Sequence, residues 1–149
     1  MICEQPFLLA SGPWVEIRDG NATAMALYDR HYSRNNAAKG CLRIVGPGER
    51  IVLLTPDARA LFVWRKFISK DQQVGVNCAI FRNESDARSS DLILSAMVIA
   101  RARWPGERFY TYVNPRKVKS PNPGYCFKAA GWRVCGTTKT RRLIVLEAA

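Results

Sequence analysis

The alternation of apolar and polar positions along the chain predicts a series of short strands. Five stretches have the length, the β-branched or aromatic content and the polar or Gly/Pro borders of strands. A Gly-Pro-Gly turn inside residues 41–55 divides that segment into two further strands. The five stretches are residues 14–18 (WVEIR), 60–67 (ALFVWRKF), 76–84 (VNCAIFRNE), 108–113 (RFYTYV) and 141–147 (RRLIVLE).

The strongest helical pattern covers residues 89–104 (SSDLILSAMVIARARW). Ser89 or Ser90 is suited to cap its first turn, and Asp91 suits the positive end of the helix. The Pro-Gly pair at 105–106 is a strong stop signal. We therefore expect this helix between the strand at 76–84 and the strand at 108–113.

Two shorter helices complete the predicted elements. The first follows the opening strand, with Asp19 or Asn21 as its cap. The second occupies residues 122–132, where Asn122 precedes a proline suited to the first helical turn and Gly131 ends the helix. The order is a strand and a helix, a meander of strands, and two helix–strand units. This order predicts an α/β (α+β) protein with a mixed β-sheet flanked by helices.

Length and composition indicate one folded domain over residues 1–149. The chain has 48% hydrophobic and 23% charged residues, enough for a core and unlike a disordered segment. No stretch approaches the roughly 18 apolar residues of a membrane span, and no basic segment leads into the N-terminal apolar run. Five cysteines with irregular spacing and no Cys-x-x-Cys argue against a disulfide framework or a structural zinc site. We expect buried thiols in a protein of the cytoplasm, with no membrane partner.

The net charge says more about the partners of this protein than its overall composition does. Lys and Arg number 23 against 12 acidic residues, which gives a formal charge of +11. A field of this sign attracts nucleic acid, phosphorylated cofactors or anionic membrane. The sequence therefore favours a polyanionic partner over a merely basic soluble protein.

The element order, with its helix–strand–helix–Ala-Gly-Trp ending at residues 130–132, resembles the GNAT acyltransferase fold. The resemblance implies a GNAT-like single domain. Enzymes of that fold hold the pyrophosphate of coenzyme A in a glycine-containing loop at a helix N-terminus. The corresponding segment, residues 81–92 (FRNESDARSSDL), contains no glycine. A side chain there obstructs the close approach of the backbone to a pyrophosphate, so acetyl-CoA is not the expected cofactor.

Four motifs together resemble the phage Mom family of DNA-modifying enzymes. They are HYSR at 31–34, FRNES at 81–85, YTYVNP at 110–115 and NPGYCFKAAGW at 122–132. The resemblance implies a GNAT-like transferase that adds a carbamoylmethyl-type group to the exocyclic amine of adenine and protects phage DNA from restriction. It also implies a possible iron, with His31 as a possible ligand. Asn114 stands where the family commonly has Asp, which removes a possible base or metal ligand.

Four residues are the candidate catalytic groups. His31, the single histidine, can act as a base near neutral pH, or it is a surface residue beyond a helix end. Arg82, after the apolar part of its strand, can hold an anionic part of the donor, or it is an ordinary strand-end arginine. Asn114 and Tyr125 supply an amide and a phenol for the edge of an adenine; the resemblance places Tyr125 in the active site.

A further set is expected to bind substrate. Ser89 and Ser90 either receive a small anion or serve only as the helix cap. Tyr112, on the same face of its strand as Tyr110, either stacks on a flipped base or belongs to a pair of core rings. Asn122 reads the base or only caps its helix. The complete set is Tyr32, Ser33, Asn83, Glu84, Ser89, Ser90, Tyr112, Asn122 and Phe127.

Basic residues of the second half are candidates for a rim that holds DNA phosphates. A run of charge is otherwise a solvated face. The candidates are Arg101, Arg103, Arg116, Lys117 and Lys119, joined by Arg141 and Arg142.

The sequence thus predicts a transferase that flips an adenine of double-stranded DNA into a pocket between diverging strands and modifies its amine with a group from a small-molecule donor. Two alternatives remain open at this stage. One is an acetyl-CoA-dependent N-acetyltransferase acting on a small amine or a protein. The other is a non-catalytic DNA-binding anti-restriction protein.

Overall fold

The computed structural model describes residues 12–30, 48–67, 72–118 and 121–149. Within them the chain forms a seven-stranded mixed sheet in the order β1-β2-β3-β4-β5-β7-β6. The expected mixed α+β architecture is confirmed, whereas the strand expected before residue 46 lies outside the described residues. The elements are β1 (Val15–Ile17), α2 (Ala22–Asp29), β2 (Glu49–Leu54), β3 (Ala60–Lys66), β4 (Val76–Asn83), α3 (Ser89–Arg103), β5 (Phe109–Val113), α4 (Tyr125–Ala129), β6 (Arg133–Thr137) and β7 (Ile144–Ala148).

The strand pairing changes from antiparallel to parallel at the centre of the sheet. Strands β1 to β4 are paired antiparallel, β4 and β5 are parallel, and β5 pairs antiparallel with β7. A parallel pair needs a crossover, which α3 provides between β4 and β5. The meander followed by a helix–strand unit therefore has the connectivity that the sequence predicts.

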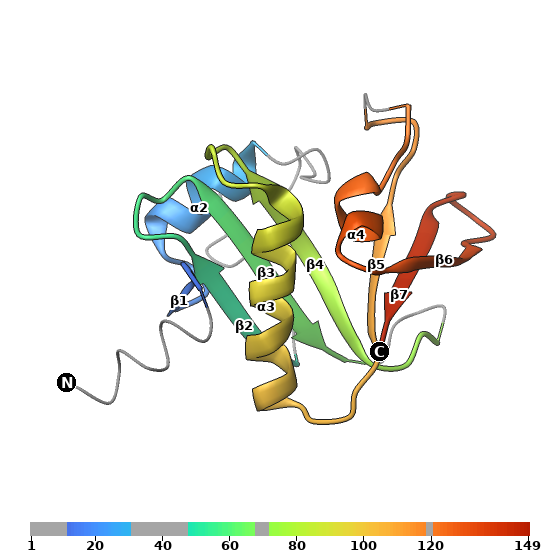
Figure 1. Cartoon of the computed structure of the whole chain (residues 1–149), viewed down its shortest axis with the longest axis horizontal. Helices are drawn as coiled ribbons and strands as arrows, with labels where there is room; N and C mark the ends of the chain where they lie inside the picture. Colours follow the sequence, from blue (N-terminus) through green and yellow to red (C-terminus); the bar gives the residue numbers. More distant parts are fainter. Residues whose placement is uncertain (1–11, 31–47, 68–71, 119–120) are drawn as a thin grey trace.

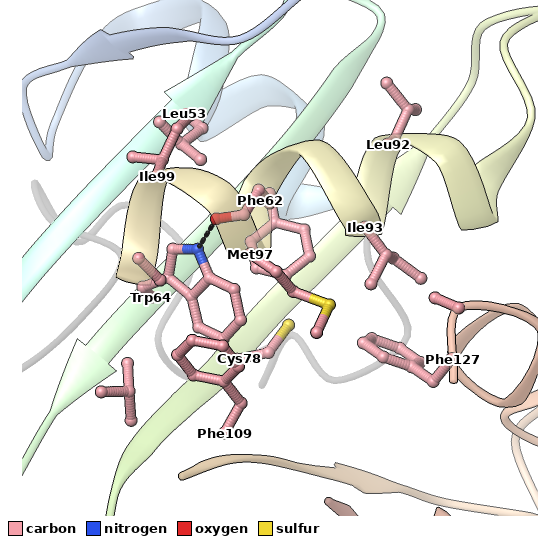
Figure 2. Close-up of a cluster of buried hydrophobic side chains, with 14 of the residues drawn as sticks. Leu53, Phe62, Trp64, Cys78, Leu92, Ile93, Met97, Ile99, Phe109 and Phe127 are labelled. Atoms are coloured by element: carbon pink, nitrogen blue, oxygen red, sulfur yellow. Dashed lines mark hydrogen bonds between the residues drawn. The ribbon is translucent and has the colours of Figure 1, made fainter. Parts of the chain in front are cut away.

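Helices cover both faces of the sheet (Figure 1). The main core lies between the sheet and the helices α3 and α4, where Trp64 is fully buried beside Phe62 and Phe109. The indole Nε1–H of Trp64 donates to the carbonyl oxygen of Ala96 at 3.0 Å, which fixes α3 on β3 (Figure 2). A second cluster, which includes Leu27 of α2, packs on the opposite face.

The first helix begins as the sequence predicts. The Asn21 side-chain oxygen accepts hydrogen bonds from the backbone N–H groups of Thr23 and Ala24, at 3.0 and 3.2 Å. This is the usual N-cap arrangement of asparagine, and it identifies Asn21 rather than Asp19 as the cap.

The predicted caps of the other two helices are wrong. Arg88, in an extended conformation and without a side-chain cap bond, precedes α3, so Ser89 and Ser90 are helical residues. Gly124, in the left-handed conformation, precedes α4 in place of Asn122. In both cases the capping position lies one or two residues along the sequence from the side chain best suited to it. The preceding loop fixes the residue at which helical dihedral angles begin.

Strand β6 has no counterpart in the sequence prediction. All five of its residues are exposed, so it lacks the apolar alternation that marks a half-buried strand. It forms because its backbone pairs with β7 at the edge of the sheet. The predicted last strand, β7, is thus the second strand of a hairpin.

Candidate functional site

The central feature of the candidate site is the separation of β4 from β5. Their parallel pairing runs from Val76↔Phe109 to Cys78↔Thr111 and then stops. On the other side of β4, Val63 pairs with Ile80 and Trp64 with Cys78, so Ala79 is an extra residue in the ladder. A bulge bends its strand and increases the local twist. The two strands accordingly diverge beyond this point, as Figure 1 shows.

A cavity of about 320 Å³ opens where the strands diverge. Its size lies at the lower end of the roughly 300–1,000 Å³ that small-molecule sites occupy. Its walls come from β4, from β5 and the turn after it, from α4, and from the residues before β7. The lining residues are Cys78, Ala79, Phe81, Thr111, Tyr112, Val113, Asn114, Lys117, Val118, Gly124, Cys126, Phe127, Arg141 and Leu143. The predicted pocket between diverging strands therefore exists.

Two aromatic rings form part of the cavity wall. Phe81 of β4 and Phe127 of α4 meet edge to face, with 6.0 Å between ring centroids. Phe127 is buried and also packs on Trp132, which holds it in place from behind. The cavity thus offers flat apolar surface of the kind that stacks on a planar ligand.

Asn114 lies at the edge of the same cavity, directly after β5. Its side-chain oxygen accepts the backbone N–H of Arg116 at 3.1 Å, and its carbonyl oxygen accepts the N–H groups of Lys117 and Val118. The Asn-Pro sequence ends the strand as expected, and the asparagine organises the turn that follows. Its amide nitrogen is the group that this turn leaves available for a ligand.

Two thiols line the cavity. Burial raises the pKa of Cys78, and burial also raises the pKa of the half-buried Cys126. Both are therefore protonated at neutral pH, and neither has the thiolate character of a nucleophile. The Thr111 hydroxyl donates to the carbonyl oxygen of Cys78 at 3.0 Å, which adds a hydrogen bond at the last paired position of β4 and β5.

Arg82 and Glu84 do not line the cavity. Arg82 donates Nε–H to Glu84 at 2.9 Å and Nη1–H to the carbonyl oxygen of Arg30 at 2.9 Å. Glu84 also accepts both donors of a bidentate contact from Arg30, at 2.7 and 2.9 Å. These contacts connect the end of β4 to the end of α2 on the face opposite α4.

Asn83 organises the loop before α3 instead of lining the cavity. Its side-chain oxygen accepts the N–H and hydroxyl of Ser85, and its nitrogen donates to Ser89 Oγ at 3.0 Å. Ser85 Oγ in turn accepts the N–H of Ala87 at 3.2 Å. The amides of this glycine-free loop are thus partly satisfied by its own side chains. The N–H groups of Ser85 and Ala87 are therefore not free for a pyrophosphate, and the expectation that acetyl-CoA is not the cofactor stays a prediction.

Tyr112 lines the cavity, whereas the other remaining predicted site residues are spread more widely. Tyr112 meets Tyr110 edge to face at 5.7 Å, which confirms that the two rings share one side of β5. Tyr125 is 62% exposed and outside the cavity lining. Asn122 accepts a hydrogen bond from Lys128 Nζ at 2.7 Å. His31, Tyr32, Ser33 and Lys119 lie outside the described residues.

The predicted phosphate rim divides into two groups. Lys117 and Arg141 line the cavity, and Arg116 Nη2–H donates to the carbonyl oxygen of Arg141 at 2.8 Å. Arg101 and Arg103 instead belong to the last turn of α3. There Arg103 pairs with Glu16 of β1, and Arg101 donates to the carbonyl oxygen of Ala149. Their expected grouping with Arg116 is wrong, because α3 ends at the other end of β5.

A signal in the sequence marks the cavity side of the molecule. Residues 108–146 contain no acidic residue, although they include nine Lys or Arg. Of these, Arg108 and Arg133 pair with Glu147. Six others make no ion pair within the described part of the chain: Arg116, Lys117, Lys128, Lys139, Arg141 and Arg142. Two of these six, Lys117 and Arg141, line the cavity, and Arg116 is hydrogen-bonded to Arg141, so uncompensated positive charge lies at the cavity.

The described residues hold no group of three or more His, Cys, Asp or Glu side chains able to bind a metal ion. His31, the possible iron ligand that the resemblance implies, lies outside these residues. Over the same residues, no helix has the length and apolar character needed to cross a membrane.

No family model, curated protein or solved structure matches the chain.

Proposed function

We propose that this protein is a transferase that modifies the exocyclic amine of adenine in DNA, with the base turned out of the duplex into the cavity between β4 and β5. The observation that carries the proposal is the combination of an aromatic cavity with a mouth of uncompensated positive charge. Enzymes that modify a base remove it from the stack and hold it between apolar or aromatic side chains. The surrounding cations attract the phosphates on either side of that base.

The cavity walls suit a purine. Phe81 and Phe127 supply apolar surface for the flat faces of the ring. The Asn114 amide, at the cavity edge, is of the residue type that recognises adenine by paired hydrogen bonds. Because its oxygen already accepts one bond from Arg116, its orientation is set before a ligand arrives. Preorganisation of this kind reduces the entropy lost on binding.

The chemistry of the proposed step constrains the roles of the residues. The amine nitrogen of adenine forms a bond to the electrophilic carbon of the donor, and the leaving group departs with its electron pair. The amine must also lose a proton. Cys78 and Cys126 cannot take this proton, because burial raises their pKa values and both thiols are already protonated at neutral pH. The resemblance to the Mom family implies proton transfer by His31, which lies outside the described residues. It also implies hydrogen bonding by Tyr125, which is exposed and does not line the cavity, so its role requires contact with the donor or the DNA outside the cavity.

A second candidate is an acyltransferase that uses a thioester donor. It is favoured by the edges of β4 and β5 that lie unpaired with each other beyond Cys78 and Thr111. Such edges can hydrogen-bond to an extended, amide-containing donor lying between them. The glycine-free loop at the start of α3 weighs against it, because Asn83 and Ser85 occupy its amides.

Nucleoside mass spectrometry tests the proposal. If the reaction takes place, DNA from cells or virus particles that carry the gene contains adenine bases with the transferred group attached. We expect an adenosine-derived mass with the wild-type protein, and its loss with Cys126→Trp, in which the indole fills the cavity. Cys135→Trp is the matched control, since Cys135 is exposed on β6. Tyr125→Phe should also abolish the product without unfolding the protein, because the side chain is 62% exposed.

The outcomes separate the candidates. Unmodified adenosine from DNA of such cells, with folded protein present, refutes the proposal. The thioester-dependent acyltransferase would bind coenzyme A in its native state. Strong thermal stabilisation of the protein by coenzyme A therefore favours this second candidate. DNA binding without any altered nucleoside indicates the non-catalytic DNA-binding protein.

A further inference from the structure

The loop that joins β6 to β7 has an unusual concentration of charge. The loop spans residues 138–143, and its central four residues, 139–142, are Lys-Thr-Arg-Arg, all of them exposed. No carboxylate among the described residues pairs with any of its three cations. Three like charges on so short a loop repel one another, which is a cost unless an anion binds there.

The loop is nonetheless held in one shape. Thr138 donates its N–H to the carbonyl oxygen of Leu143 at 2.8 Å, and the N–H of Leu143 donates to Thr138 Oγ1 at 2.9 Å. These two bonds close the base of the loop. Arg142 has a φ of +55°, a conformation that a residue with a side chain adopts only at a cost.

Arg116 fixes the loop from outside. Its Nη2–H donates to the carbonyl oxygen of Arg141 at 2.8 Å, across 25 residues of sequence. The Arg116 guanidinium is thereby directed at the loop backbone, and Arg141 is one of the residues that line the cavity. The loop is thus placed at the mouth of the cavity, next to Lys117, which also lines it.

We infer that residues 139–142 form a phosphate-binding finger that grips the DNA backbone beside the nucleotide whose base enters the cavity, with Arg116 as a positioning residue for the finger. This inference rests on the proposed function in one respect, namely that DNA is the partner. Arginine is suited to the task because its planar guanidinium binds a phosphate through two parallel hydrogen bonds. A base that leaves the duplex needs its flanking phosphates held, since unstacking costs free energy.

Fluorescence anisotropy with a labelled DNA duplex, titrated at several salt concentrations, tests the finger without any donor. The double variant Arg141→Gln/Arg142→Gln is compared with Arg101→Gln/Arg103→Gln, which removes the same charge from the end of α3. Each lost phosphate contact reduces the slope of log K against log salt by about 0.9. We expect the finger variant to lose about two units of slope and the α3 variant to keep the wild-type slope.

Arg116 requires a different pair of variants. Arg116→Lys keeps the charge but loses the guanidinium geometry that reaches the Arg141 carbonyl. If Arg116 positions the finger, this variant weakens affinity as much as Arg116→Gln does, whereas a direct phosphate contact would survive in the lysine variant. Arg142→Gly distinguishes an effect on DNA binding from an effect on stability. This variant should have a higher thermal midpoint of unfolding, because glycine accepts the positive φ. It should nevertheless bind DNA more weakly.

The results distinguish this inference from the proposed function. Wild-type affinity and slope in the finger variant would overturn the finger and leave the base-modifying proposal standing. A wild-type protein that binds no DNA would overturn both. Competition by poly-glutamate as strong as by DNA of equal charge would show a general polyanion surface, and would overturn the assignment to nucleic-acid phosphates.

Discussion

Arg30 and Glu84 form a bidentate ion pair, with Nε to Oε2 at 2.7 Å and Nη2 to Oε1 at 2.9 Å. The pair joins the end of α2 to the end of β4 across 54 residues of sequence. The hydrogen bonds from Arg30, with Arg82 adding to them, lower the pKa of Glu84 to about 2. A residue expected to contact substrate thus has a structural role in the observed fold.

The first prediction is a pH dependence of stability carried by Glu84. Its pKa is lower in the folded protein than in the unfolded chain, so the ionised form favours folding. This contribution is complete above the ordinary carboxyl pKa of about 4.3 and is lost as the pH falls toward 2. We expect Glu84→Gln to lower the free energy of unfolding at pH 7 by about 1 kcal/mol.

Urea denaturation of both proteins between pH 7 and pH 2.5 measures this difference. The gap between wild type and Glu84→Gln should narrow as the pH falls. Asp86→Asn is the control, since Asp86 is exposed, lies outside the helices and makes none of the ion pairs of the described residues. A gap that stays constant over this range would contradict the role assigned to Glu84.

The second prediction concerns two glycines with positive φ. Gly124, with φ +79°, precedes α4, and a Cβ there would lie 2.6 Å from Leu146 Cδ1. Gly131, with φ +95°, follows α4, and a Cβ there would have no neighbour within 4 Å. Gly131→Ala should cost about 1 kcal/mol of stability from backbone strain alone. Gly124→Ala should cost about 2–3 kcal/mol, because steric overlap adds to the strain.

Equilibrium unfolding of the two alanine variants provides the comparison. Equal losses would mean that the contact between residue 124 and β7 is looser than the structure indicates. Because Gly124 also lines the cavity, its variant should in addition impair ligand binding, and Gly131→Ala should not.

The third prediction is an order of thiol reactivity. Cys135 is exposed, Cys126 is half-buried at the cavity, and Cys78 is buried. Burial raises the pKa of both cavity thiols, which lowers their thiolate fraction. Among these three thiols of the described residues, a maleimide should therefore modify Cys135 first, Cys126 more slowly and Cys78 only on unfolding.

Peptide mapping by mass spectrometry after timed labelling follows each thiol separately. DNA containing an extrahelical adenine should slow the labelling of Cys126 further, as expected of a residue that the base covers. Modification of Cys126 at the rate of Cys135 would contradict the position of α4 over the cavity.

The fourth prediction concerns the cap of α2. Asn21 accepts two backbone N–H groups at the start of this helix. Asn21→Ala should therefore destabilise the protein by about 1 kcal/mol, whereas Asn21→Ser should cost less because serine retains a capping oxygen. Thermal unfolding of the three proteins measures the effect. Identical midpoints would show that α2 is held by its buried face and not by its cap.

The local elements of this protein follow from short-range patterns. The alternation of Phe109 with Tyr110 and Tyr112 predicts the two faces of β5, and the structure confirms it. The apolar spacing of α3 is likewise visible in the sequence, which also narrows the cap of α2 to Asp19 or Asn21, because a few neighbouring residues decide these features. The absence of glycine before α3 is also read from the sequence, and the poor fit to a pyrophosphate that it implies stays a prediction.

Only the tertiary structure decides the site. Arg82 and Glu84 are strand-end polar residues in the sequence, and it is Arg30, far away in the chain, that gives them a structural partner. Strand β6 has no apolar pattern and exists through its pairing with β7. The cavity depends on where β4 and β5 stop pairing, which the extra residue Ala79 sets. Such features arise from backbone pairing between distant segments, and no local pattern of side chains encodes where that pairing ends.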